Sequence, residues 1–522
     1  MIRSFLTVSS GTLASRLLGF LRDSMIAALL GTGAVADAFL VAFQFVNVVR
    51  RLLSEGALNA ALVPSWLRLR EIAGAPKAAA FAGRVLGTIS AILIAAALLI
   101  GFLMPLVMTA LAPGFAGHET LHLAVNDARL MLPYLAFAGP ATVLLALASA
   151  QGRFALTAFS PLLFNIALIV VMVGLILARQ EAGVVAPVLA ATIGIAGFLQ
   201  LLILIPRRHE QDNAAPLRIS FDAEMRDFLA RAIPGMVASA GPQLLMVAGA
   251  IIASSTPSSV SWLYFANRLI ELPLGIAGVA MGTVLIPELT RAFRGGNKDD
   301  IAHAQSRALE LAAGLALPAM FGLIVLAEPI VRVLFEHGAF ASADTAATSH
   351  ALVFLALGLP AQVLVKAISP AFFAREDTLA PLLATLKAFV VAAVAAVLLG
   401  HFFGTSGIAA AIAFGAWSNA SSLIRQGVTT FGIWLDAAAR RRLPRISAAA
   451  LLMGALLWLA VDLASPLLSD SHLLVQAAVL LGLIAAGVAT YGSLLVWWFG
   501  SSLHFLLRAG QENFRTKTTL ES

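Results

Sequence analysis

The chain carries one long apolar run after another, and this pattern restricts it to folds that a bilayer can hold. A helix that crosses the hydrocarbon core needs about 20 mainly apolar residues. Hydrophobic residues make up 60% of the 522 residues and charged residues only 12%, which is about half the charged fraction of soluble domains. Backbone groups in lipid must be satisfied internally, so such runs form helices. The sequence therefore predicts an all-α polytopic membrane protein.

We count about fourteen runs that are long enough to cross a bilayer. They cover, broadly, residues 5–30, 34–64, 79–108, 125–150, 157–179, 184–206, 226–253, 258–290, 305–336, 346–373, 378–403, 406–434, 446–465 and 473–500. Several of these runs exceed the thickness of one bilayer, and we expect the corresponding helices to tilt, bend or extend into water.

Basic residues are concentrated in every second connection between these runs. Arg68, Arg207, Arg208 and the run 440–445 belong to the basic set, whereas APGFAGHET and SPLLSDSH contain no Lys or Arg. Loops rich in Lys and Arg remain cytoplasmic, so both termini are predicted to lie there. The net charge of +7 is explained by these short loops, and no nucleic-acid partner is expected.

Enzymatic and metal sites have little support in the sequence. The chain has no cysteine, no GxxxxGK[ST] and no GxSxG. Residues 118–122 read HETLH, which matches HExxH, but they fall in the predicted connection between the runs 79–108 and 125–150, and the other seven histidines show no metal-ligand spacing. We therefore expect no enzyme activity, no cofactor and no metal. The first 30 residues do not read as a cleavable signal peptide, because Arg16 and Arg22 interrupt the apolar region.

The chain also contains an internal repeat. Residues 139–163 align without gaps to residues 359–383, which matches Pro140 to Pro360 and Pro161 to Pro381. An even number of spans separates the copies, so the two halves share one orientation, as in transporters built from parallel repeats. The repeat predicts two pseudo-symmetric six-helix lobes, at 1–206 and 207–434, followed by two C-terminal helices and a cytoplasmic tail at 435–522.

Charged residues inside the apolar runs mark a candidate binding site. A charge at the centre of a spanning helix costs about 2.5–3.5 kcal/mol on insertion scales, so such residues are usually functional. In the first run, Arg16 lies near the middle and Arg22 closer to the outer face. Arg16 could instead form a structural ion pair with Asp23 or Asp37, and Arg22 could extend to the outer interface. Asp23 is expected to be an arginine partner.

The second run adds a polar stripe. Asn47, Arg51 and Glu55 are spaced four residues apart and share one helix face, and Arg50 lies on the adjoining face. Arg51 could pair with Glu55 or anchor the inner interface, so Arg50 is the better ligand candidate. Asp37 begins this run, where it could equally cap the helix.

Two later runs also carry cations. In FANRLIELP, Arg268 lies near the middle of its run, with Asn267 and Glu271 within one turn, and pairing of Arg268 to Glu271 is the structural alternative. Lys366 stands in the apolar run VLVKAISPAFFARED. Arginine offers a planar fork of donors that stays charged and suits phosphate oxygens. The cations therefore favour an anionic cargo with a diphosphate, bound in a water-filled space between the lobes.

At these residues the chain resembles the MurJ (MviN) family of lipid II flippases over essentially its whole length. The segments that carry the resemblance are SRLLGFLRD, ADAFLVAF, NVVRRLLSEGALNAALVP, PGF, FANRLIELPLGIAGVAMGTVLIP and VKAISPAFFARED. The resemblance implies fourteen helices of the multidrug/oligosaccharidyl-lipid/polysaccharide exporter superfamily. It also implies transfer of a lipid-linked peptidoglycan precursor from the inner to the outer leaflet of the cytoplasmic membrane.

The family's cavity arginines match Arg16, Arg22, Arg50 and Arg268, its aspartate of the second helix matches Asp37, and its lysine of the tenth matches Lys366. Two positions depart from the family pattern: Asn267 stands where Asp is common, and Phe373 where Tyr is common. The first change alters the surroundings of Arg268, and neither change removes an arginine.

The expected function is thus a lipid II flippase that works by alternating access. Its partners would be lipid II (undecaprenyl-diphosphate-linked muropeptide) and the bilayer, and other cell-wall synthesis proteins are compatible with this role. The alternatives are a flippase for another undecaprenyl-linked saccharide, such as an O-antigen or capsule unit, and a scaffold for cell-wall enzymes. A multidrug cation antiporter is disfavoured, because it would require carboxylates in place of arginines.

Overall fold

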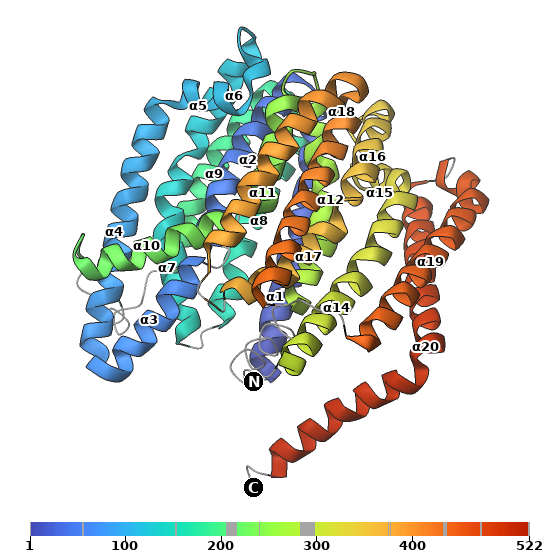
Figure 1. The fold of residues 1–522 in the computed structure, drawn as a ribbon. Coiled ribbons are helices and arrows are strands. Elements are labelled where there is room, and N and C mark those ends of the chain that lie inside the picture. The colour runs from blue at the N-terminus through green and yellow to red at the C-terminus, as the bar shows by residue number, and fades with distance from the viewer. Residues whose placement is uncertain are drawn as a thin grey trace. The chain divides into compact units, whose positions relative to one another are not determined.

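The computed structural model describes residues 2–54, 57–151, 154–204, 214, 217–239, 241–281, 298–373, 375, 377–431, 436–469 and 472–519. Nearly all of these residues are helical, and none of them forms a strand, which confirms the predicted all-α class. The helices (Figure 1) are α1 (Ile2–Leu30), α2 (Ala34–Ser54), α3 (Ala57–Ala73), α4 (Ala75–Phe102), α5 (Met104–Leu111), η1 (Pro113–Phe115), α6 (Glu119–Met131), α7 (Pro133–Ala150), α8 (Phe154–Leu177), α9 (Ala182–Leu204), α10 (Ala223–Ser239), α11 (Gly241–Ala253), α12 (Ser259–Ala280), α14 (Lys298–Val325), α15 (Ala327–Phe335), α16 (Ser342–Ala356), α17 (Leu359–Phe373), α18 (Leu379–Phe431), α19 (Ala437–Ser469) and α20 (Leu473–Thr519).

The helices form two compact units. Unit 1 comprises Met1–Leu272, Leu334–Gly358 and Arg375–Leu423, and unit 2 comprises Pro273–Val333, Leu359–Ala374 and Ile424–Ser522. The arginines of α1, α2 and the first part of α12 all belong to unit 1. The three-part division at residues 206 and 434 stays a prediction.

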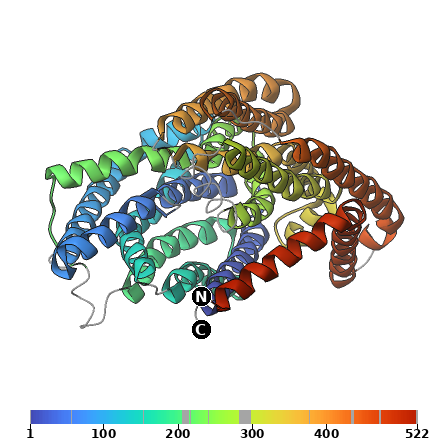
Figure 2. The same ribbon diagram turned by 60° about the horizontal axis from the view of Figure 1, so that its bottom comes forward.

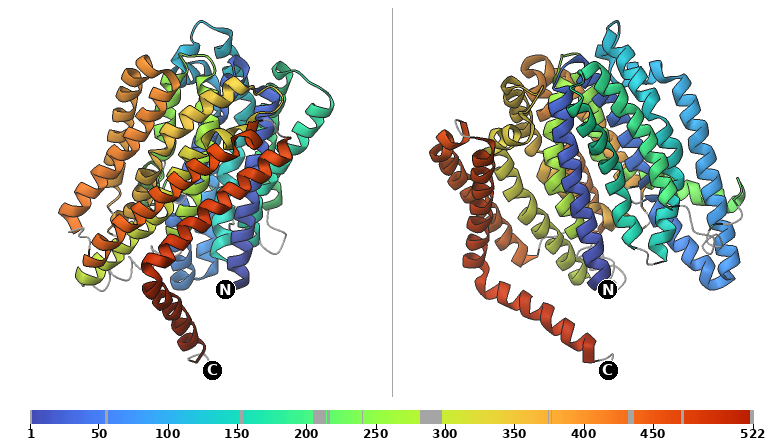
Figure 3. Two further views of the ribbon diagram at one scale, coloured as in Figure 1. Left: turned by 90° about the vertical axis from the view of Figure 1, so that its right-hand side faces the viewer. Right: turned by 180° about the vertical axis from the view of Figure 1, so that it is seen from behind.

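In unit 1, helices distant in sequence pack along one another. α1 lies along α8, α2 along α6, and α7 along α9 (Figure 3). Side chains of α3, α4, α7 and α10 form a shared core that includes Trp66, Phe81, Val143 and Phe228. Burial of each large apolar side chain of this kind stabilises the folded state by about 1.5–3 kcal/mol.

The predicted run 226–253 is divided into two helices in the structure. α10 crosses the direction of α4, and α11 follows it as a separate helix (Figure 1). α10 is amphipathic, with Met225 and Phe228 buried and Arg226 and Asp227 exposed. A helix with such a polar face is unsuited to a lipid-surrounded span and suited to a membrane surface.

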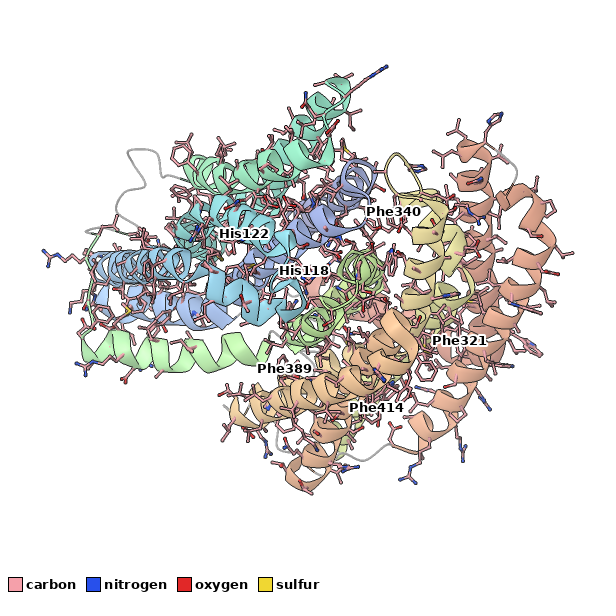
Figure 4. All side chains as sticks on the ribbon, turned by 90° about the horizontal axis from the view of Figure 1, so that it is seen from above. His118, His122, Phe321, Phe340, Phe389 and Phe414 are labelled. Atoms are coloured by element: carbon pink, nitrogen blue, oxygen red, sulfur yellow. The ribbon has the colours of Figure 1, made fainter. Side chains whose placement is uncertain are left out.

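One end of unit 1 is closed by contacts that we call the upper seam: Ala28 and Thr32, at the end of α1 and beyond it, meet Ala339 and Asp344. The Ala339 N–H donates to the Ala28 carbonyl at 2.8 Å, and the Thr32 hydroxyl donates to Asp344 at 2.7 Å. Gly31 has a φ of 61° and faces the Ala339 backbone, where a side chain would not fit. His118 and His122, at the start of α6, and Phe340 also lie at this end (Figures 1 and 4).

Unit 2 is built from long helices that pack in pairs. α14 packs against α17 and α19, and α19 pairs with α20 (Figures 2 and 3). Its apolar core includes Leu326, Met453, Leu457 and Leu480.

Seven helices among the described residues are long and apolar enough to cross a membrane, or up to eight if a bent pair counts as one span. α18 alone covers 53 residues and changes direction at Gly404, whose φ of 56° is not helical. The protein is therefore a multi-pass membrane protein, and the count of fourteen spans stays a prediction.

Candidate functional site

Arginines that are far apart in sequence come together within unit 1. Arg16 and Arg22 lie on α1, Arg51 on α2 and Arg268 on α12. We call these four residues, with the two carboxylates that connect them, the arginine cluster. Its members are Arg16, Arg22, Asp23, Arg51, Arg268 and Glu271.

The buried side of the cluster is centred on Arg22, which is 6% exposed. Its guanidinium pairs with Asp23 at 2.6 Å and donates to the side-chain oxygen of Asn165 on α8 at 3.0 Å. The rings of Phe43 and Phe164 lie 5.1 and 5.7 Å from its central carbon, within the range of cation–π attraction. Arg22 is thus enclosed by protein and does not extend to the outer interface.

Asp23 connects this buried side to α12. It is fully buried, and its second carboxylate oxygen forms an ion pair with Arg268. The hydroxyl of Tyr264 also donates to Asp23, at 3.5 Å. A buried carboxylate requires such partners, because an isolated buried charge is strongly unfavourable. Asp23 therefore has two arginine partners in the structure, Arg22 and Arg268.

Glu271 organises the more accessible side. Its carboxylate accepts hydrogen bonds from Arg51 and Arg268, both at 2.7 Å, and one from the amide of Asn267 at 3.4 Å. Arg16 donates to the Glu271 carbonyl at 3.4 Å. The side chains of Arg51 and Glu271 are both 21% exposed, compared with 7% for Arg22. A ligand would therefore meet Arg51 and Glu271 before Arg22.

A glycine makes room for Arg268. A methyl group added at Gly19 would lie 2.5 Å from Nη2 of Arg268. On its other side, the Arg268 guanidinium lies 5.3 Å from the centre of the Phe20 ring. The backbone of α1 therefore fixes where this guanidinium can lie.

The remaining residues of the predicted site are placed as follows. Arg50 donates to Asn47 at 3.3 Å, one turn earlier on α2. Asp37 accepts from the backbone N–H groups of Ser258 and Ser261 at 2.8 and 2.9 Å. It therefore caps α12, which is not its own helix. Lys366 belongs to unit 2, where Gly278 is its neighbour. Glu55 lies outside the described residues.

Asn165, Tyr264 and Gly19 were not identified from the sequence. Asn165 and Tyr264 do carry a signal, because a single polar side chain in an apolar run has to find a partner inside the protein. No pattern distinguishes Gly19 from the other glycines of the chain. Its importance depends on which side chain packs against it.

The cluster has the chemistry of an anion site. Each of its two carboxylates serves two arginines: Asp23 holds Arg22 and Arg268, and Glu271 holds Arg51 and Arg268. Guanidinium groups held in this way present their remaining donors in a fixed geometry. Phosphate oxygens are acceptors that such forks bind bidentately.

A model of the family described as "Lipid II flippase MurJ" matches residues 26–477. A protein of Rhizobium meliloti (strain 1021) named "Probable lipid II flippase MurJ" is 38% identical over 98% of this chain and 96% of its own length. A protein of Burkholderia cenocepacia named "Lipid II flippase MurJ" is 29% identical over 88% of this chain and 90% of its own length.

Solved structures show the same fold. A structure titled "Lipid II flippase MurJ, inward closed conformation" matches with a TM-score of 0.76 at 23% identity, covering 95% of this chain and all of its own. An inward-facing multidrug resistance MATE family transporter of the MOP superfamily matches with a TM-score of 0.66 at 18% identity, covering 82% of this chain and 96% of its own.

Proposed function

Because the chain belongs to the lipid II flippase MurJ family, we propose that it moves lipid II from the inner to the outer leaflet of the cytoplasmic membrane. The observation that carries this proposal is the arginine cluster. It joins Arg16, Arg22 and Arg51, from the first half of the predicted repeat, to Arg268, from the second half. A site made by both halves is where a transporter with parallel repeats would bind its cargo.

In this proposal, some residues of the cluster bind the cargo and others position those residues. Arg16, Arg51 and Arg268 bind the diphosphate of the cargo, and Glu271 holds their side chains between transport events. Arg22, Asp23 and Asn165 form the buried foundation that keeps Arg268 in place. Arg50 and Asp37 complete the proposed cargo-binding residues of unit 1, and Lys366 of unit 2 stays a predicted cargo-binding residue.

The cargo is a lipid, so its tail stays in the apolar phase while only the charged head crosses. The predicted lobes alternate between inward-open and outward-open states around the head group. The membrane potential can bias this cycle by about 2.3 kcal/mol per charge per 100 mV. We place both termini in the cytoplasm, from the distribution of basic loops.

Single substitutions test the site. Arg51→Ala and Arg268→Ala should each reduce translocation of lipid II in membrane vesicles at equal protein levels. Loss of a charge-assisted hydrogen bond costs about 1.5–3 kcal/mol, which corresponds to roughly 10- to 100-fold in affinity. The matched control is Arg179→Gln, an exposed arginine between α8 and α9, and it should transport normally.

Two results would contradict the proposal. The first is that lipid II reaches the outer leaflet at the normal rate in a host depleted of this protein and of any other flippase. The second is that both arginine variants transport as well as the control. Vesicles loaded with other undecaprenyl-linked glycans identify a flippase of different cargo specificity.

A further inference from the structure

A short segment that is neither helix nor strand lies against α4, outside the arginine cluster. We call residues 217–222 the strap. The Arg218 N–H donates to the Gly83 carbonyl at 3.5 Å, and the Thr88 hydroxyl both donates to the Ser220 carbonyl at 3.1 Å and accepts from the Ser220 N–H at 3.0 Å. A methyl group at Gly87 would lie 2.6 Å from the Arg218 carbonyl oxygen. The strap backbone is thus held directly on the surface of α4.

Ion pairs fix the end of the strap where α10 begins. Arg84 of α4 pairs with Asp222 and with Glu224, each at 2.6 Å. Arg226, one turn into α10, donates to the Phe221 carbonyl at 2.9 Å. These charged groups therefore have partners within the protein. The apolar side chains of the strap are the part of it for which a partner remains to be identified.

Those side chains form an exposed row. Leu217, Ile219 and Phe221 are 65, 62 and 55% exposed. Arg218 and Ser220, which lie between them, bond to α4 through their backbone. Three neighbouring exposed apolar side chains on a backbone that is bonded to α4 are typical of an interaction surface.

The position of the row indicates what covers it. Most residues of α4 between Phe81 and Ile89 are buried. Further along, the helix exposes Ile92, Ile94 and Leu98, as expected of a span that faces lipid. The strap covers α4 just before this lipid-facing part, and its row continues that surface toward the start of the helix. Arg218 and Arg226, both exposed, lie beside the row.

We propose that the strap is an interfacial anchor for anionic lipid. Its apolar row enters the boundary between head groups and acyl chains of the leaflet in which α4 begins, and Arg218 and Arg226 contact the lipid phosphates. This combination of an apolar face with basic residues is the one that binds membrane surfaces. The proposal concerns how the protein is seated in the bilayer, and it holds independently of the transported cargo.

Spin labels can test the anchor without background, because the chain contains no cysteine. The full chain carrying Ile219→Cys is labelled and placed in vesicles of phosphatidylcholine mixed with phosphatidylglycerol. Collision with oxygen and with a polar nickel complex then reports its depth. Leu98→Cys supplies the lipid benchmark, and Ala75→Cys, exposed at the start of α4, supplies the water benchmark.

The label at residue 219 should resemble the label at residue 98, with high collision with oxygen and low collision with nickel. Removing the phosphatidylglycerol, or adding Arg218→Gln and Arg226→Gln, should shift the collision rates of the label at residue 219 toward those of the water benchmark. A label that matches residue 75 in every vesicle overturns the anchor. Protection that appears only when cytosolic protein is added also overturns it, in favour of a protein partner. An immersion depth that is insensitive to anionic lipid overturns the role of the two arginines.

Discussion

The Arg268 guanidinium is surrounded by residues of α1 and by Glu271 of its own helix. Asp23 and Glu271 hold its nitrogens, the Phe20 ring lies against its plane, and Gly19 of α1 leaves the space that its Nη2 occupies. Guanidinium groups are useful for phosphate recognition only while their fork points in the right direction. In the proposed site, the neighbours of Arg268 therefore set the direction of its fork.

Gly19→Ala should displace Arg268 and reduce transport while the protein still reaches the membrane. The new methyl group would lie 2.5 Å from Nη2 of Arg268, so the flexible guanidinium would have to move while the rest of the packing stays in place. The measurement is lipid II translocation at equal protein levels. Gly174→Ala in α8, which has open space around it, is the matched control. Equal transport by both variants would show that the position of Arg268 is unimportant.

At the scale of the helices, aspartates connect the N-terminus of one helix to a neighbouring element through hydrogen bonds. Asp37 of α2 caps α12, and Asp344 at the start of α16 accepts from Thr32 and from the Trp262 ring N–H. In unit 2, Asp436 precedes α19 and accepts from the Ala439 N–H at 2.6 Å and from the His303 ring at 3.1 Å. Side-chain acceptors of this kind satisfy the free N–H groups of a helix start.

The stability of the first turn of α19 should depend on pH, because Asp436 caps this turn. Burial alone would raise the pKa of Asp436, but the Ala439 N–H and the His303 ring hold this pKa below its usual range. Because the pKa is lower in the folded state, the stabilisation is complete above the unfolded value of about 3.9. It is lost as the pH falls through the folded value.

Hydrogen exchange of residues 437–443 in nanodiscs measures this effect. Their protection, corrected for intrinsic exchange, should fall as the pH is lowered below about 4. Asp436→Ala, which removes the acceptor for the Ala439 N–H, should show the reduced protection already at neutral pH and little further change on acidification. Identical profiles for the variant and the unmodified protein would contradict the assignment.

The end of unit 1 at which α1 finishes is held together by hydrogen bonds. The upper seam joins the end of α1 to residues 339–344. In the proposed cycle, this end has to open for the cargo head to leave.

Locking the seam should stop transport. The Ala28→Cys/Ala339→Cys pair joins two positions whose backbones are hydrogen-bonded at 2.8 Å. Oxidation should abolish lipid II translocation, and a reductant should restore it. Each single variant should transport under both conditions, since the chain has no other cysteine. Normal transport by the fully cross-linked protein would show that the seam stays closed throughout the cycle.

The apolar runs and the buried charges determined the class of the protein and most of its candidate residues. Period and composition are local properties, so α9 was predicted to within two residues at each end and the start of α20 at Leu473 was predicted directly. The run 79–108 is instead divided between α4 and α5, and the pairing of Arg268 with Glu271 three residues later was one of the alternatives that the spacing left open. The resemblance of the motifs then supplied the family. The sequence also gave reasons to suspect that Asp23 binds an arginine.

Only the tertiary structure decided which partner each charge takes. Glu271 meets Arg51 across 220 positions, Asp37 caps α12 across more than 220, and Asn165 holds Arg22 across 143. Helical spacing reaches about one turn along the chain, so it contains no information on such pairs. The packing of α1, α2, α8 and α12 brings these groups together, because buried charges must find partners and those four helices supply them.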